Sequence, residues 1–311
     1  MEHPAYSQLR PVTPSAGVVL CDNPSYSALE GTNSWIIRAP GDRVAVIVDP
    51  GPHDEGHLNV LQAQAEAGGA EIALILLTHH HGDHADGAPR FRQLTGAPVR
   101  AADKRWCAGG EVLEHGELIS FDGLTPTIEV VATPGHTGDS LCFFIHGAGG
   151  AAGTDDDVEG IISGDTLAGR HTTMISETSG DLGDYLDSLR LLDKRSHGVR
   201  LLPGHGPDRD DAAEVVEKYI NRRERRITQV TEAVEKLVED FFNDTATTEI
   251  YTLSLHDALP SQAGTFCNSK YHNDSFNYKH TLIFVPVFFS IHTTCFVEAV
   301  IDEEKINFRF H

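Results

Sequence analysis

A seven-residue segment of this 311-residue chain concentrates side chains that can bind metal ions. It reads Thr78-His79-His80-His81-Gly82-Asp83-His84 and follows an apolar run over residues 72 to 77, which predicts a buried strand. Four imidazoles and a carboxylate are costly to remove from water unless each has a partner. A metal ion supplies that partner, and the H-x-H-x-D-H spacing lets alternate side chains reach one ion while the next pair reaches a second. A solvated histidine-rich loop or a single adventitious metal site is the alternative interpretation of this segment alone.

Three further ligand-type residues follow predicted strands and lie beside glycine: His136, Asp165 and His205. A single His or Asp in a turn is usually structural, but four such strand ends in one chain favour a common site. The adjacent glycines let the backbone turn sharply and approach an ion closely. Asp49, which ends another predicted strand over residues 44 to 48, is expected either to form a turn or to orient a ligating histidine.

The segments around these residues predict an α/β fold. Apolar runs between residues 17 and 48 indicate antiparallel strands, and residues 57 to 69 indicate a helix that ends at a glycine pair. The strand that leads to the histidine segment comes next, so the order is strand, helix, strand. Amphipathic helices are predicted over residues 181 to 193 and 212 to 239.

The order of the four motifs resembles the metallo-β-lactamase superfamily of zinc hydrolases, over roughly residues 17 to 240. The motifs that carry the resemblance are Thr78-His79-x-His81-x-Asp83-His84, Pro134-Gly135-His136-Thr137, Ser163-Gly164-Asp165-Thr166 and Pro203-Gly204-His205-Gly206. The resemblance implies an α/β (α+β) fold, the four-layer αβ/βα metallo-β-lactamase sandwich, with the metals at one edge.

The resemblance also implies two bound Zn²⁺ ions, although iron or manganese could take their place. In that family's pattern His79, His81 and His136 hold one ion, Asp83, His84 and His205 hold the other, and Asp165 bridges the two.

This ligand set predicts hydrolysis. Two cations about 3.5 to 4 Å apart lower the pKa of a shared water towards neutrality, so that a metal-bridging hydroxide can act as the nucleophile. One ion would polarise the oxygen under attack, and the other would stabilise the leaving group. The candidate catalytic residues are Asp165, as the bridge, and Asp83, as a ligand that could also accept a proton.

The fold and the metals leave the substrate open. Glyoxalase II-like thioesterases share the ligand set, but residues 167 to 174 depart from their basic glutathione-binding pattern. Residues 164 to 173, 180 to 189 and 203 to 207 are similar to the lactamase-like protein 2 branch, whose members include endoribonucleases acting on single-stranded RNA. The expected substrates are therefore RNA phosphodiesters or, alternatively, a small-molecule thioester, ester or lactone. An iron-dependent oxidoreductase on the same fold is the non-hydrolytic alternative.

Composition narrows the class of protein. The formal net charge of -22 disfavours non-specific attraction to nucleic acid or to an anionic membrane. Four arginines lie between residues 222 and 226, and a solvated helix face is favoured over phosphate contact there.

The five cysteines lack metal-binding spacing, which indicates reduced thiols. No signal peptide or membrane span is evident, so we expect a cytoplasmic protein; the sequence does not indicate an oligomeric state.

The character of the sequence changes abruptly at residue 243. Residues 243 to 260 resemble the conceptual translation of a DNA-sequencing adapter, and residues 262 to 311 hold eight of the 14 Phe but a single Arg. We therefore predict a hydrolase domain over residues 1 to 242 and a non-native tail over residues 243 to 311 that adds no catalytic group. The alternative is a genuine second domain that follows a linker of unusual amino-acid composition.

Overall fold

The computed structural model describes residues 6–147, 157–176 and 178–243 and three later strands. These strands are β12 (Thr281–Ser290), β13 (Thr293–Asp302) and β14 (Lys305–Phe310), which form an antiparallel sheet. The adapter-like segment lies, apart from Asn243, outside the described residues. The chain divides into two compact units, residues 1–223 and 224–311.

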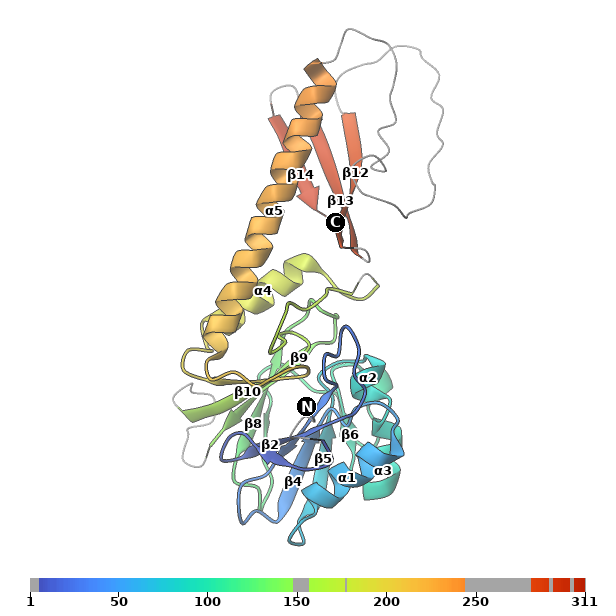
Figure 1. Ribbon diagram of the computed structural model, residues 1–311, viewed down its shortest axis with the longest axis vertical. Coiled ribbons are helices and arrows are strands. Elements are labelled where there is room, and N and C mark those ends of the chain that lie inside the picture. The colour runs from blue at the N-terminus through green and yellow to red at the C-terminus, as the bar shows by residue number, and fades with distance from the viewer. Residues whose placement is uncertain are drawn as a thin grey trace. The chain divides into compact units, whose positions relative to one another are not determined.

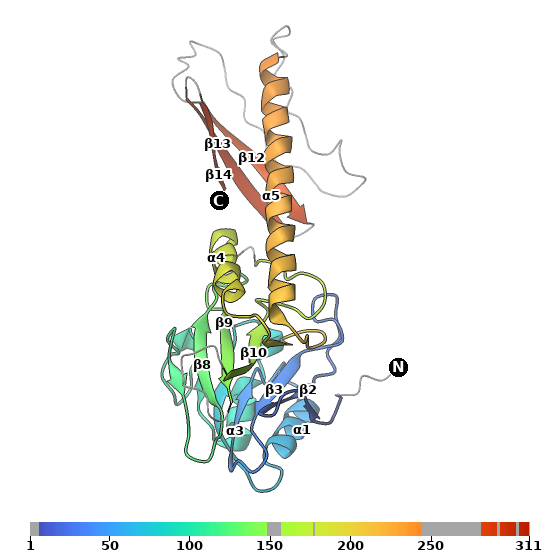
Figure 2. The ribbon, with the colours of Figure 1, turned by 90° about the vertical axis from the view of Figure 1, so that its left-hand side faces the viewer.

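The first unit contains two β-sheets (Figures 1 and 2). The six-stranded sheet has the order β1 (Arg10–Pro11), β2 (Ala16–Leu20), β3 (Asn33–Ile37), β4 (Val44–Val48), β5 (Glu71–Leu76) and β6 (Val99–Arg100). The five-stranded sheet has the order β11 (Arg200–Pro203), β10 (Val158–Gly164), β9 (Leu141–His146), β8 (Thr127–Ala132) and β7 (Leu118–Ile119).

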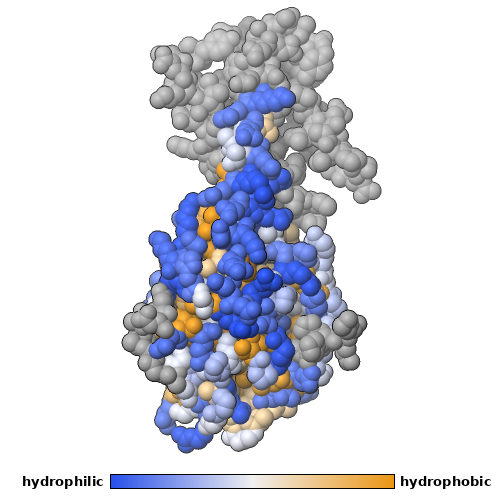
Figure 3. Space-filling model, turned by 60° about the vertical axis from the view of Figure 1, so that its left-hand side comes forward, coloured by the Kyte–Doolittle hydropathy of each residue, from blue (hydrophilic) through white to orange (hydrophobic). Residues whose placement is uncertain are grey.

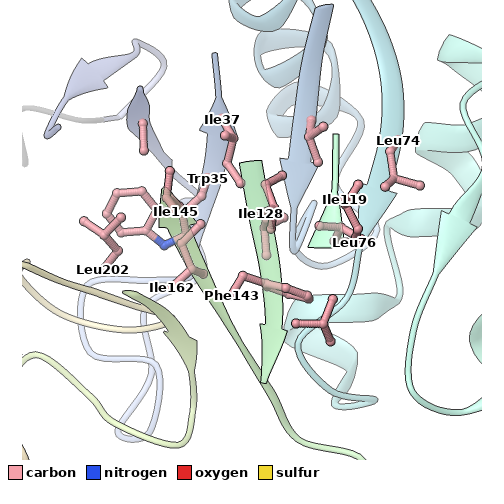
Figure 4. Close-up of a cluster of buried hydrophobic side chains, with 14 of the residues drawn as sticks. Trp35, Ile37, Leu74, Leu76, Ile119, Ile128, Phe143, Ile145, Ile162 and Leu202 are labelled. Carbon is pink, nitrogen blue, oxygen red and sulfur yellow. The ribbon is translucent and has the colours of Figure 1, made fainter. Parts of the chain in front are cut away.

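The side chains between the two sheets form one hydrophobic core (Figure 4). Trp35 and Leu76 enter it from the six-stranded sheet, and Phe143, Ile145 and Leu202 enter it from the five-stranded sheet. Every residue of β3 and β9 is buried, as expected for strands that are covered on both faces.

Helices cover the outer face of each sheet. The helices α1 (Glu55–Ala65) and α3 (Ala88–Thr95) pack on the six-stranded sheet through Leu58, Leu61 and Phe91. The helix α4 (Leu182–Asp193) and the start of α5 (Ala212–Asn243) pack on the other sheet through Leu189 and Val216. The layers therefore run helix, sheet, sheet, helix, which confirms the predicted four-layer sandwich.

Strand direction brings the predicted strand ends to one edge. The strands β4 and β5 are parallel, so Asp49 and Thr78 follow them at the same edge of the six-stranded sheet. In the other sheet β8 and β10 are both antiparallel to β9, and β11 is parallel to β10, so these three strands also end together. The backbone N–H of Leu141 donates to the Thr78 carbonyl at 2.8 Å and links the two edges.

Among the described residues, no helix is long and apolar enough to cross a membrane. The face in Figure 3 is mostly hydrophilic, and the hydrophobic residues visible on it are scattered.

We predict that Phe143→Ala destabilises the first unit by about 3–5 kcal/mol, because the ring is completely buried between the sheets and its loss leaves a cavity. Chemical unfolding followed by tryptophan fluorescence, to which the buried Trp35 contributes, measures this change. The matched control is Leu118→Ala, whose side chain is 44% exposed and should contribute less than about 0.5 kcal/mol. Equal unfolding midpoints for the two variants would contradict the assignment of this core.

Candidate metal centre

The structure brings all seven predicted ligand residues to the shared edge of the two sheets, in two groups. In the first group, the Nδ1 atom of His81 lies 3.1 Å from Nε2 of His79 and 3.0 Å from Nε2 of His136. In the second group, Nε2 of His205 lies 3.1 Å from Nε2 of His84 and 3.2 Å from Oδ2 of Asp83.

Asp165 lies between the groups. Its Oδ2 atom is 3.7 Å from Nε2 of His136, and its Oδ1 atom is 3.4 Å from Nε2 of both His84 and His205. Oδ1 is buried and has no hydrogen-bond partner among the described atoms. One carboxylate thus presents one oxygen to each group.

Two backbone carbonyls fix the tautomers of two histidines. Nδ1 of His136 donates to the Met174 carbonyl at 2.5 Å, and Nδ1 of His205 donates to the Gly31 carbonyl at 3.1 Å. A carbonyl can only accept, so each Nδ1 carries the proton and each Nε2 turns a lone pair inwards when the ring is neutral. Neither carbonyl could be predicted to take this role, because every residue type has a backbone carbonyl.

Asp49 orients two more histidines. Its Oδ2 atom accepts from Nδ1 of His84 at 2.9 Å and from Oγ1 of Thr78 at 2.6 Å. The hydroxyl proton of Thr78 is thereby used, so this hydroxyl accepts from Nδ1 of His79 at 3.0 Å. Asp49 therefore orients ligand-type histidines, which was the second of its two predicted roles.

Tight packing at two glycines sets the turns that present His136 and Asp165. Gly135 has a φ of 141°, and a Cβ atom there would lie 2.3 Å from Cα of Tyr185 in α4. Gly164 has a φ of 48°, and a Cβ atom there would lie 2.4 Å from Oγ1 of Thr78. Only glycine fits such positions without displacing its neighbours.

The ligand-type groups shift one another's pKa values. Burial lowers the pKa of His79 well below its usual range, and burial with the neighbouring His136 lowers that of His81 to about 4. Burial also opposes protonation of His84, but Asp165 and Asp49 outweigh it and raise the pKa of His84 well above its usual range. Asp165 is itself buried, yet the surrounding histidines hold its pKa well below its usual range. The carboxylate therefore stays ionised.

This donor set fits metal ions. The inward nitrogens meet at 3.0–3.1 Å, where lone pairs of neutral imidazoles repel unless a proton or a cation lies between them. The outward nitrogens of four of the five rings are already hydrogen-bonded, as is common for metal-binding histidines. The residues present two groups of His and Asp that could hold a dinuclear metal site.

The remaining histidine of the segment, His80, belongs to neither ligand group. Its Nδ1 atom lies 2.7 Å from Oδ1 of Asp139, and its ring stacks near Trp106. Asp83 and His84 lie in a short helix, α2 (Gly82–Ala85).

Comparisons with known proteins agree with this geometry. The family model for the metallo-beta-lactamase superfamily matches residues 28–205. The atrochrysone carboxyl ACP thioesterase of Aspergillus fumigatus is 30% identical over 231 residues, which cover 73% of this chain and 67% of the relative. The beta-lactamase-like protein 2 homolog of Caenorhabditis elegans is 27% identical, and the match covers 75% of each chain.

A solved structure shows the same fold. The beta-lactamase domain protein of Burkholderia ambifaria superposes with a TM-score of 0.60 at 19% identity, over 75% of this chain and 81% of that one. The matched family model begins before Asp49 and ends at His205, so it spans every residue of both groups. The chain belongs to the metallo-beta-lactamase superfamily.

Proposed function

We propose that this chain is a dinuclear metal-dependent hydrolase that cleaves a small activated thioester or ester. The observation that carries the proposal is the position of Asp165, with one carboxylate oxygen towards each ligand group. Superfamily membership supports a hydrolase-like function in general. The thioesterase relative and the net charge of -22 favour a small thioester over RNA.

Zinc is the proposed metal. His79, His81 and His136 would hold one ion, and Asp83, His84 and His205 would hold the other, with Asp165 shared between them. Two ions held there would supply a water of lowered pKa as nucleophile and a Lewis acid for the scissile carbonyl.

The chain's own residues would keep this chemistry in place. Asp165 stays ionised and would offset the charge of the cations. The hydrogen bonds that three imidazoles donate to Asp49, Met174 and Gly31 fix the orientation of these rings. The side chain of Asp83 is 34% exposed. Its pKa is lowered: burial opposes this shift, but the contact with Nε2 of His205, which donates when that ring is protonated, and the charge of His84 outweigh it. An ionised carboxylate in contact with solvent can pass a proton between water and the site.

Turnover assays of the zinc-loaded chain test the reaction and the substrate together. We expect hydrolysis of an acyl thioester, such as an acylglutathione or an acyl-N-acetylcysteamine, and no cleavage of single-stranded RNA. A lactone serves as the second small-molecule arm. Cleavage of RNA alone would overturn the substrate class, and oxidation without hydrolysis in an iron-loaded sample would favour the oxidoreductase alternative.

We predict that Asp165→Ala reduces zinc binding from two ions per chain to at most one and abolishes hydrolysis, because it removes a donor from both groups. Metal analysis after equilibrium dialysis gives the stoichiometry. Asp122→Ala is the matched control, since the side chain of Asp122 is fully exposed. Two tightly bound ions in Asp165→Ala would be incompatible with the shared role of this carboxylate.

We predict that Asp49→Ala weakens zinc binding at the second group by about 10- to 100-fold, because His84 loses the acceptor that orients its ring. Competition with a zinc chelator measures the affinity. Asp139→Asn alters a nearby carboxylate that bonds His80 instead and should leave this affinity unchanged. An unaltered affinity in Asp49→Ala would show that the Asp49–His84 hydrogen bond has no influence on the metal.

A further inference from the structure

The helix α5 makes polar contacts with the loop that follows Asp165, and the proposed chemistry does not use them directly. The hydroxyl of Tyr219, 2% exposed, accepts from the backbone N–H groups of Ala168 at 3.0 Å and Thr173 at 3.2 Å. One buried oxygen thus ties together two points of the loop that are five residues apart.

Arg223 lies one helical turn after Tyr219 and holds the same loop. Its Nη2 atom donates to the Thr173 carbonyl at 2.5 Å, and its guanidinium lies 5.3 Å from the centre of the Tyr185 ring. Because Tyr219 accepts from the N–H of Thr173, both backbone polar groups of Thr173 are bonded to α5. The arginine cluster predicted a solvated helix face, whereas the side chain of Arg223 makes these contacts within the first unit.

The next residues of the loop hold His136 by two contacts. The Met174 carbonyl accepts from Nδ1 of His136 at 2.5 Å, and the backbone N–H of Ser176 donates to the His136 carbonyl at 3.0 Å. The Thr173 carbonyl, which Arg223 holds, and the Met174 carbonyl, which orients the imidazole, belong to consecutive residues.

The second ligand group is supported differently. The loop reaches it through the backbone, where the N–H of Gly169 donates to the His205 carbonyl at 3.0 Å. The imidazole of His205 is oriented by the Gly31 carbonyl, and that of His84 is oriented by Asp49. A displacement of residues 173–176 would therefore act mainly on the first group.

We propose that Tyr219 and Arg223 are positioning residues that set the orientation of the His136 imidazole and thereby the metal affinity of the first group. The inference rests on the proposed function only in requiring that the two groups bind metal. Without the hydroxyl of Tyr219, two backbone N–H groups lose their acceptor, and the loop must shift to satisfy them. The bond to Nδ1 of His136 weakens as the Met174 carbonyl moves, because hydrogen bonds depend steeply on distance and angle.

The test measures zinc affinity at each group separately in the full chain. His205→Ala disables the second group and leaves the first to be titrated against a chelator, and His81→Ala does the reverse. Tyr219→Phe is then added to each background, and Tyr26→Phe, at a fully exposed tyrosine, is the matched control. Arg223→Met is a second variant, which keeps the aliphatic packing but removes the donors. Circular dichroism and unfolding monitored by tryptophan fluorescence confirm that each variant is folded.

We expect Tyr219→Phe to weaken zinc binding by about tenfold or more in the His205→Ala background and to have little effect in the His81→Ala background, with Arg223→Met showing the same selectivity. Equal losses in both backgrounds would indicate general loosening and overturn the inference, as would unchanged affinity in the first group. If the parent chain binds no zinc, the proposed function fails and the inference fails with it; if the parent binds two ions, only the inference is at risk.

Discussion

The cost of burying polar groups beside one another governs this structure. Four of the five ligand-type imidazoles are almost fully buried, and their inward nitrogens face one another at hydrogen-bonding distance. Such an arrangement is unfavourable in an apolar interior unless every group has a partner. The outward nitrogens find theirs in Asp49, Thr78 and two backbone carbonyls. The inward nitrogens face one another and the Asp165 carboxylate. Two cations bound among them would remove the repulsion between the nitrogen lone pairs and balance the negative charge of Asp165.

The sandwich provides the rigidity that this arrangement needs. Strands of both sheets end at the same edge, so a few residues beyond each strand are sufficient to reach the centre. Gly135, in the turn after β8, and Gly164, the last residue of β10, are packed too closely for any Cβ atom, which leaves the following ligand-type side chains little freedom. The ligand positions are thus set by the same close packing that stabilises the domain.

Much of the fold and of the candidate centre could be predicted from the sequence, because both leave local signals. The apolar runs before Thr78 and His136 indicated strands, and side chains that can ligate a metal are recognisable by type. The supporting contacts leave no such signal. The carbonyls of Gly31 and Met174 belong to residues of no distinctive chemistry, and their role depends on how remote loops fold back.

The helix α5 illustrates a different limit of sequence reasoning. Four clustered arginines indicated a charged, solvated surface, yet Arg223 donates to a loop carbonyl and lies over an aromatic ring. Tyr219, which has no neighbouring motif, is almost fully buried and bonded to two backbone groups. Amphipathic spacing predicts that a helix packs, but it does not predict which atoms of a remote loop its polar side chains contact.

Because its ligands come from both sheets, the candidate metal centre would also hold the two halves of the domain together. Asp83 and His84 come from the half of the molecule built on the six-stranded sheet, whereas Asp165 and His205 come from the opposite half. Ions coordinated by both halves would join segments that are far apart along the chain, such as those of His84 and His205, which are 121 residues apart. Because such coordination exists only in the folded protein, removing the ions with a chelator would lower the stability of the domain at this edge as well as abolish hydrolysis.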